Sequence, residues 1–293
     1  MPADSTVRTR RLDCRGMTST TDAYFLPGPE STTDTGQFTR TFTATEHTES
    51  PWGRGFQHGS PPAALITHVL EQVVPETGGR LVRVTTELLG AVPLGELHAV
   101  GRVVRPGRRI CLVEAVVTDP AGREVIRGSG WWVRTRDTAG IETPGERSGA
   151  DEAGASSATG MVPLEEATST AFAEMWSSGY IDSLVTRDAP GQLWLHSRIP
   201  VVAGVPDSPW TRLAAVADVA NGTNPTLDPK SWTFMNTDLS IQLHRLPRGQ
   251  WIGISAEASY GPDGIGLTSG RIHDLDGPVG TTSQSLMLEP IAT

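Results

Sequence analysis

Apolar and polar positions follow two different periods in the N-terminal third of the chain. Residues 37–44 alternate, with apolar side chains and Arg40 on one face and threonines on the other, which predicts a strand. A Gly- and Pro-rich stretch then leads to Ser60, a residue type suited to capping a helix. From there apolar residues recur at helical spacing as far as Val73, and Pro75 ends the predicted helix.

The remaining pattern predicts the same arrangement a second time. Turns containing Pro and Gly separate four strand-like runs after the first helix, at residues 81–89, 96–104, 109–118 and 124–133. The second half begins with a strand at residues 192–198 and a helix at 209–219 that Ser208 caps. Four strands follow, at residues 235–244, 250–259, 266–273 and 280–288. An extra helix-like segment, residues 172–185, joins the two halves.

Turn residues indicate that one unit occurs twice. Pro93 and Pro247 stand 154 positions apart, and Gly122 and Gly277 stand 155 positions apart. A tandem repeat of roughly 110 residues, each copy with a strand, a helix and an antiparallel meander, explains this order. The positions at which the two copies differ then point to a functional site.

Composition shifts divide the chain into four segments. Residues 1–35 are polar and rich in Ser and Thr, and we expect a disordered N-terminal arm there. Residues 36–135 form the first repeat. Residues 136–165 are a linker of Gly, Ala, Ser, Thr and Glu, and residues 166–293 form the second repeat.

Composition also excludes several classes of protein. The chain has 293 residues, of which 37% are hydrophobic, enough for a packed core. Its net charge of −9 argues against nucleic-acid binding, which needs a basic face. No apolar run approaches the ~20 residues of a membrane-spanning helix, and because the first residues contain no apolar stretch we expect no secretory signal. The two cysteines, Cys14 and Cys111, lie in different contexts, so we expect no disulfide, no metal site, no cofactor and a cytoplasmic location.

A long antiparallel sheet wrapped around one helix is a hotdog, and two in tandem make a double hotdog of the α+β class. The chain resembles the acyl-CoA thioesterase II-like family of double-hotdog proteins over residues 36–290. The resemblance rests on segments that occur in the same order and spacing: Phe56–Leu65, Ala214–Asp218, Asn236–Arg245, Gly266–Gly277 and Thr281–Gln284.

Two polar residues of the second repeat are the first candidates for catalysis. Asp218 stands in an Ala/Val run on a helix that we expect to be buried, where the pKa of a carboxyl rises toward the range of a general base. It could equally bond a neighbouring backbone group. Gln284 cannot take a proton and could orient a water molecule, or it could be an exposed strand residue. Its counterpart at an offset of 155 is Ser129, so the two repeats differ there.

The resemblance implies that Asp218, Gln284 and a hydroxyl residue between them surround one water molecule. The middle position falls on Asn236 when the neighbouring motif residues are held in register. Thr237 would need a one-residue slip, which turns its side chain to the opposite face of the sheet. Asp238 matches the family motif, and we expect it to support the strand or the site rather than to act as a catalyst.

The start of the first predicted helix offers a place for an oxyanion. Backbone N–H groups at a helix N-terminus bind negative charge, and Gly59 would allow a substrate to approach closely. His58 could act as a second base or contact the substrate, or it could be a solvent-facing loop residue.

We therefore expect hydrolysis of an acyl thioester, on coenzyme A or a carrier protein, by water that Asp218 and Gln284 activate. Two alternatives stay open at this point. The same groove could dehydrate, isomerise or cyclise a thioester-bound biosynthetic intermediate, or it could bind acyl thioesters without turnover. The resemblance also implies a homo-oligomer. The net charge and the lack of an apolar spanning run lead us to expect no nucleic-acid or membrane partner, and the sequence leaves the acyl chain length open.

Overall fold

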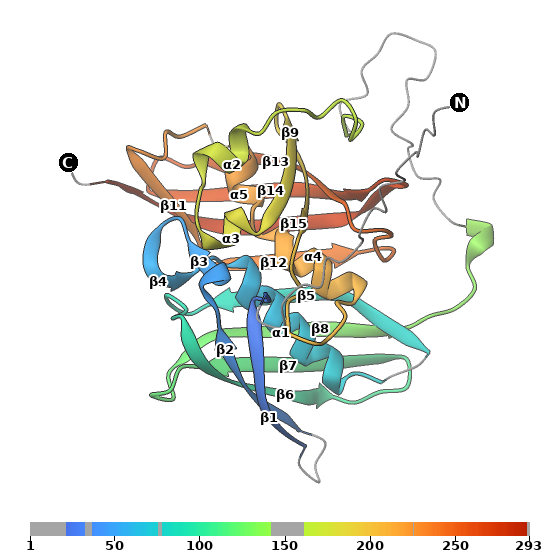
Figure 1. Cartoon of the computed structure of the whole chain (residues 1–293). Helices are drawn as coiled ribbons and strands as arrows, with labels where there is room; N and C mark the ends of the chain where they lie inside the picture. Colours follow the sequence, from blue (N-terminus) through green and yellow to red (C-terminus); the bar gives the residue numbers. More distant parts are fainter. Residues whose placement is uncertain (1–21, 33–36, 76–77, 142–160, 225, 292–293) are drawn as a thin grey trace, which may run out of the picture.

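The computed structural model describes residues 22–32, 37–75, 78–141, 161–224 and 226–291, and one large antiparallel sheet dominates it (Figure 1). The sheet has 13 strands, in the order β1-β2-β6-β7-β8-β5-β12-β15-β14-β13-β10-β9 with β11 paired to β15. The strands of its first half are β1 (Phe25–Thr32), β2 (Phe38–Ala44), β5 (Gly79–Leu88), β6 (Gly95–Arg105), β7 (Ile110–Thr118) and β8 (Glu124–Arg134). Those of the second half are β9 (Leu184–Ala189), β10 (Gln192–Ser197), β11 (Trp232–Asn236), β12 (Asp238–Leu243), β13 (Ile252–Tyr260), β14 (Ile265–Asp274) and β15 (Gly277–Pro290).

The two halves join at the middle of the sheet, where β5 pairs with β12. At the centre of this junction Thr85 Oγ1 and Ser240 Oγ share a hydrogen bond of 2.9 Å. Each side continues outward through a meander of long strands, so the predicted double hotdog with one continuous sheet is confirmed. A separate short hairpin consists of β3 (Glu49–Ser50) and β4 (Gly53–Gln57).

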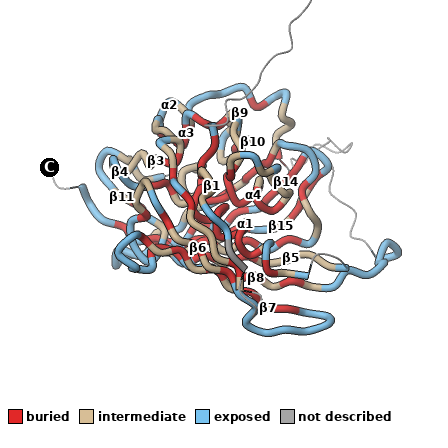
Figure 2. The backbone as a smooth tube through the Cα atoms, turned by 60° about the horizontal axis from the view of Figure 1, so that its bottom comes forward, coloured by how far each residue is buried: buried red, intermediate tan, exposed pale blue. Residues whose placement is uncertain are grey.

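Two central helices, α1 (Ser60–Val73) and α4 (Pro209–Ala217), pack against each other on the same face of the sheet (Figures 1 and 2). The predicted cap at Ser208 is confirmed, because its hydroxyl accepts a hydrogen bond from Thr211 N–H (2.9 Å). The cap of α1 is Gly59, one residue before the predicted Ser60. The sequence between the repeats forms α2 (Ala171–Met175) and α3 (Gly179–Asp182), and α5 (Ala220–Thr223) follows α4.

The expectation of a disordered arm up to residue 35 is wrong for residues 22–32; residues 1–21 and 33–36 lie outside the described residues. Strand β1 pairs with β2 along the edge of the sheet, and Tyr24 and Phe25 are completely buried. Tyr24 N–H donates to the Pro200 carbonyl (3.1 Å), and the Tyr24 hydroxyl lies 2.8 Å from Ser183 Oγ. This segment therefore ties the first repeat to the second.

The predicted linker, residues 136–165, falls mostly outside the described residues, but its last part packs on the second repeat. Met161 is buried, and the Val162 carbonyl accepts a hydrogen bond from Trp194 Nε1 (2.8 Å). The repeat thus begins a few residues earlier than expected. None of the helices in the described ranges is long and apolar enough to cross a membrane.

Candidate active site

Asp218 lies where the second central helix breaks. Helix α4 ends at Ala217, and the backbone of Asp218 and Val219 keeps αR angles without continuing the helix, until α5 begins. The break leaves the Asp218 carbonyl oxygen free to accept a hydrogen bond from Gln284 Nε2 (3.2 Å). The side chain of Asp218 is held at the same point, and the residue is only 3% exposed.

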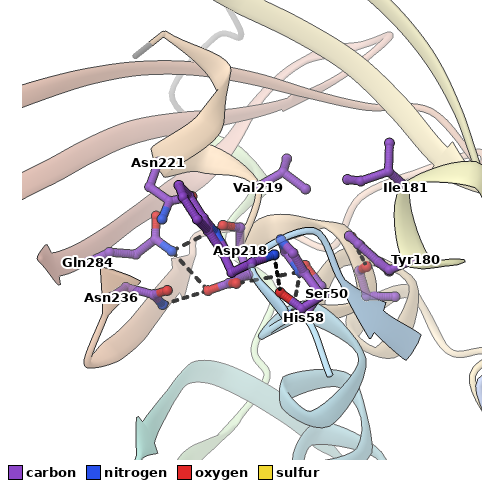
Figure 3. Close-up of polar contacts among 12 residues, drawn as sticks. Ser50, His58, Tyr180, Ile181, Asp218, Val219, Asn221, Asn236 and Gln284 are labelled. Carbon is purple, nitrogen blue, oxygen red and sulfur yellow. Dashed lines mark hydrogen bonds and ion pairs between the residues drawn. The ribbon is translucent and has the colours of Figure 1, made fainter. Parts of the chain in front are cut away.

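Two amide groups hold one oxygen of the Asp218 carboxylate (Figure 3). Oδ1 accepts hydrogen bonds from Asn236 Nδ2 (2.7 Å) and from Gln284 Nε2 (2.9 Å). Burial raises the pKa of Asp218 to about 6, and these two hydrogen bonds counteract part of the rise. At neutral pH the carboxylate is therefore ionised, yet basic enough to accept a proton. Its second oxygen, Oδ2, takes no part in these bonds.

A β-bulge decides which residue faces Asp218. Strands β11 and β12 both pair with β15, but their registers differ by one residue at Thr237. Thr237 N–H donates to the Ser285 carbonyl (3.0 Å), and Asp238 Oδ1 accepts from Ser285 N–H (2.9 Å). The ladder stays satisfied while Asn236 points to Asp218. Thr237 is exposed and does not reach the carboxylate, so of the two alternatives the structure brings Asn236 to the site.

Gln284 lies on the inner face of β15 and is completely buried. Thr85 and Ser240 face each other at the junction of the two halves and take equivalent places in them. Thr85 pairs with Ser129 and Ser240 pairs with Ser283, so the position that corresponds to Ser129 is Ser283. The counterpart of Gln284 is therefore Gly130, and the predicted Ser129 is wrong by one residue. The offset between the repeats is 154 in this strand, whereas it is 155 at the turn before it.

The first repeat has no polar group at the equivalent place. The missing side chain of Gly130 leaves room for Leu70 of α1, whose Cδ1 would lie 3.3 Å from a Cβ at that position. In the second repeat Gln284 fills the same place and contacts Asp218. Among the described residues, a buried carboxylate held in this way by two amides therefore occurs in the C-terminal half alone.

Gly59 brings the start of α1 against the Asp218 carboxylate. A Cβ on Gly59 would lie 2.3 Å from Asp218 Oδ2, so only glycine permits this approach. Among the described residues none accepts a hydrogen bond from Gly59 N–H. This N–H group at a helix N-terminus is available to a partially negative oxygen of a ligand.

His58 is buried beside the site, but it is neutral. Its Nδ1 accepts a hydrogen bond from Ser60 N–H (3.1 Å), so the proton of the ring is on Nε2. Burial lowers the pKa of His58 to about 3, and the 3.7 Å between Nδ1 and Asp218 Oδ2 is therefore a contact and not an ion pair. The ring stacks on Tyr180, with 4.2 Å between centroids. With Nδ1 occupied, a role as general base is disfavoured.

An apolar cleft is lined in part by His58, which contacts Asp218, and by Val219, the next residue along the chain. Figure 3 shows these two side chains and that of Ile181 around Asp218. The cleft has about 270 Å³ of empty space, part of which is open to solvent. We call it the aromatic cleft, because its lining includes the aromatic side chains of Trp52, Phe172, Trp176 and Phe234. Ile181 and Val219 complete most of its apolar wall.

Sequence reasoning named His58 but missed the Trp and Phe residues that line the aromatic cleft. Trp52 and Phe234 come from loop and edge-strand positions, and Trp176 comes from the segment that interrupts the repeat. That interruption, together with a Trp count of eight, is the signal that could have drawn attention to them. Within the described ranges, no three His, Cys, Asp or Glu side chains are grouped so that they could hold a metal ion.

Solved structures with a similar fold cover almost the whole chain. An acyl-CoA thioesterase II from Mycobacterium marinum is 14% identical, with a TM-score of 0.60, and the match covers 90% of this chain and 97% of that one. A hot dog fold protein of unknown function from Alicyclobacillus acidocaldarius is also 14% identical, with a TM-score of 0.64 and the same coverage of 90% and 97%. At such identities the likeness shows the fold alone. No curated protein sequence matches the chain.

Family models match both repeats. The model of the acyl-CoA thioesterase N-terminal domain matches residues 48–133, and the model of the acyl-CoA thioesterase C-terminal domain matches residues 151–288. The two matches follow the order of the two hotdogs and together span most of the sequence. The chain therefore belongs to the acyl-CoA thioesterase family.

Proposed function

We propose that this chain hydrolyses acyl thioesters with Asp218 as the general base. The observation that carries the proposal is the carboxylate itself. It is buried, it has a pKa of about 6, one oxygen is held by Asn236 and Gln284, and the other faces Gly59 at the start of a helix. A thioester carbonyl beside Gly59 N–H would lie next to the base that activates water.

The proposed reaction needs only water and the residues of the site. Water gives a proton to Asp218 as its oxygen bonds to the thioester carbon, and the carbonyl oxygen becomes negative. Gly59 N–H donates a hydrogen bond to that oxygen. When the carbonyl re-forms, the C–S bond breaks, and the sulfur takes the proton back from Asp218. Gln284 and Asn236 keep the carboxylate in place throughout, and the products are a carboxylic acid and a thiol.

Thiol release from a panel of acyl-CoAs tests the proposal, with wild type compared to Asp218→Asn. The asparagine retains the shape of the side chain and an oxygen for the two amide donors, but it cannot accept the proton. We expect a loss of at least about a hundredfold in kcat/KM, or about 2.7 kcal/mol of barrier. Asp263→Asn, at an exposed turn, is the matched control and should keep full activity. Equal rates for Asp218→Asn and wild type would refute the assignment of the base.

The presence of Asn236 favours a second candidate, because the resemblance implies a hydroxyl at that position. An amide still fixes the carboxylate, so Asp218 could instead remove a proton from carbon in a thioester-bound intermediate. Dehydration or isomerisation would then replace hydrolysis. Mass spectrometry distinguishes the two, since hydrolysis splits the thioester, whereas isomerisation leaves its mass unchanged and dehydration lowers it by one water. Ligand-induced stabilisation without any turnover would point to binding alone.

A further inference from the structure

Trp176 forms the far wall of the aromatic cleft. The residue is 7% exposed, and its ring is fixed by two aromatic neighbours, Trp52 at 5.2 Å and Phe234 at 5.8 Å between centroids. On its remaining side the indole lies against the backbone of Gly222. A Cβ there would be 3.3 Å from Trp176 Nε1. A ring held on several sides has no room to swing aside without displacing its neighbours.

A second cavity lies on the other side of this wall. It has about 980 Å³ of empty space, part of which is open to solvent, and its lining includes Thr168, Met175, Asp188, Pro190 and Thr223. The two cavities share Phe172, Trp176 and Gly222 as lining residues. The contact between the Trp176 ring and Gly222 therefore separates a small cleft next to Asp218 from a larger cavity beyond.

The size of the aromatic cleft limits what can enter it. The 270 Å³ include gaps between atoms and open solvent, and the space for the centres of water-sized groups is only about 20 Å³, which is room for one or two such groups. The walls are apolar and mostly aromatic, and such surfaces favour an apolar group. An acyl chain that continues from this cleft toward the larger cavity would meet Trp176.

We propose that Trp176, seated against Gly222, closes the acyl end of the site and restricts this chain to thioesters whose acyl group is short. The inference rests on the proposed function, because it takes the cleft beside Asp218 as the place of the acyl group. Trp176 is then a specificity-determining residue. Removal of its indole joins the cleft to the outer cavity and gives a longer chain a path.

The experiment measures kcat/KM for butanoyl-, hexanoyl-, octanoyl-, phenylacetyl-, dodecanoyl- and hexadecanoyl-CoA. Wild type should prefer the shortest acyl groups, butanoyl and hexanoyl, and should lose about tenfold or more by dodecanoyl-CoA. Trp176→Ala should raise the ratio of dodecanoyl to hexanoyl activity by about tenfold or more. Trp176→Leu provides the same readout with less lost packing, and Trp176→Phe, which keeps an aromatic wall, should retain most of the wild-type preference.

Trp251→Ala is the control, because Trp251 packs edge-on against His196 away from the cleft and its loss should leave the ratio unchanged. A wild type that prefers dodecanoyl-CoA or longer substrates overturns the proposal, and so do folded Trp176→Ala and Trp176→Leu variants with an unchanged ratio. If no thioester is hydrolysed, the proposed function fails separately. Calorimetric binding of alkyl-CoA thioethers of the same lengths then decides. Tighter binding of short than of long thioethers by wild type, with a shift toward long ones in Trp176→Ala, supports the wall at Trp176. Affinities that do not depend on chain length overturn it.

Discussion

Replacing Gly59 by alanine should disable the site by displacing the Asp218 carboxylate. The new Cβ would stand 2.3 Å from Oδ2 and 2.8 Å from Cγ. Ordinary contacts between carbon and oxygen need 3.4 Å or more, so the carboxylate has to move by about 1 Å or the start of α1 has to shift by the same amount. Either movement strains the hydrogen bonds that Asn236 and Gln284 make to Oδ1.

The expected magnitudes follow from this displacement. A misplacement of about 1 Å in a catalytic group costs about a hundredfold in rate. Overpacking of a buried site costs about 1 to 3 kcal/mol of stability. We therefore expect Gly59→Ala to lower kcat/KM about a hundredfold and to reduce the free energy of unfolding in urea by a few kcal/mol at most. Gly90→Ala is the matched control, because a Cβ at Gly90 would meet nothing within 4 Å.

A double-mutant cycle separates the clash from other effects of the new methyl group. In the background of Asp218→Ala the carboxylate is gone, so adding Gly59→Ala should no longer destabilise the protein. Equal destabilisation in both backgrounds would show that the methyl group acts on something other than Asp218. Full activity of Gly59→Ala would refute the close contact between the start of α1 and the carboxylate.

Three further predictions concern charge. First, kcat/KM should fall as the pH drops through about 6, because burial raises the pKa of Asp218 to about 6 and the protonated carboxyl cannot accept the proton of water. A kcat/KM that is constant from pH 5 to 8 would contradict this. Asn236→Asp should move that acidic limb to higher pH, since a second carboxylate beside Asp218 disfavours ionisation of the pair, and an unmoved limb would mean that position 236 does not contact the base. Arg245→Ala should destabilise the fold by about 3 to 5 kcal/mol in urea denaturation, because it leaves the completely buried Asp274 carboxylate without its bidentate partner, and a loss below about 1 kcal/mol would argue against that pairing.

Local patterns predicted most of the fold correctly, because each repeat builds its helix and meander from neighbouring segments. Sequence reasoning missed β9, the short β3–β4 hairpin and β1, and the stability of β1 is not local. Phe25 N–H donates to the Val201 carbonyl (2.9 Å), which lies far along the chain. The Pro, Gly, Ser and Thr that follow Phe25 are typical of a loop, and no period could indicate a partner in the other repeat.

The site was predictable in its polar centre and not in its surroundings. Sequence reasoning proposes Asp218, Asn236 and Gln284, and both amide side chains donate hydrogen bonds to the Asp218 carboxylate. The choice between Asn236 and Thr237 depended on a bulge, which adds one residue without any signal in the alternation of the strand. The aromatic cleft depends on Trp176, which stands in the segment between the repeats, where periodicity carries no information.

Duplication gives the pair of antiparallel helices two ends, and they have different chemistry. At one end Asp218 of α4 meets the start of α1. At the other, Glu71 near the end of α1 meets the start of α4. There the Ser208 and Thr211 hydroxyls both donate to the Glu71 carboxylate, at 2.8 Å each. All three groups are occupied with one another, and Ser208 also caps α4. We infer that this second end holds the two helices together and takes no part in catalysis.

Glu71→Ala and Asp218→Asn should therefore have opposite effects. Loss of the Glu71 carboxylate leaves two hydroxyls near the helix start without their acceptor, which should lower the free energy of unfolding by about 1 to 3 kcal/mol. Because the change lies at the far end of the helix pair, it should not couple to the site. We therefore expect kcat/KM to stay within about threefold of wild type. Asp218→Asn should instead lose activity at nearly unchanged stability. If folded Glu71→Ala protein lost about a hundredfold in kcat/KM with its stability intact, both ends of the helix pair would contribute to the reaction, and the assignment of one site to this duplicated fold would be wrong.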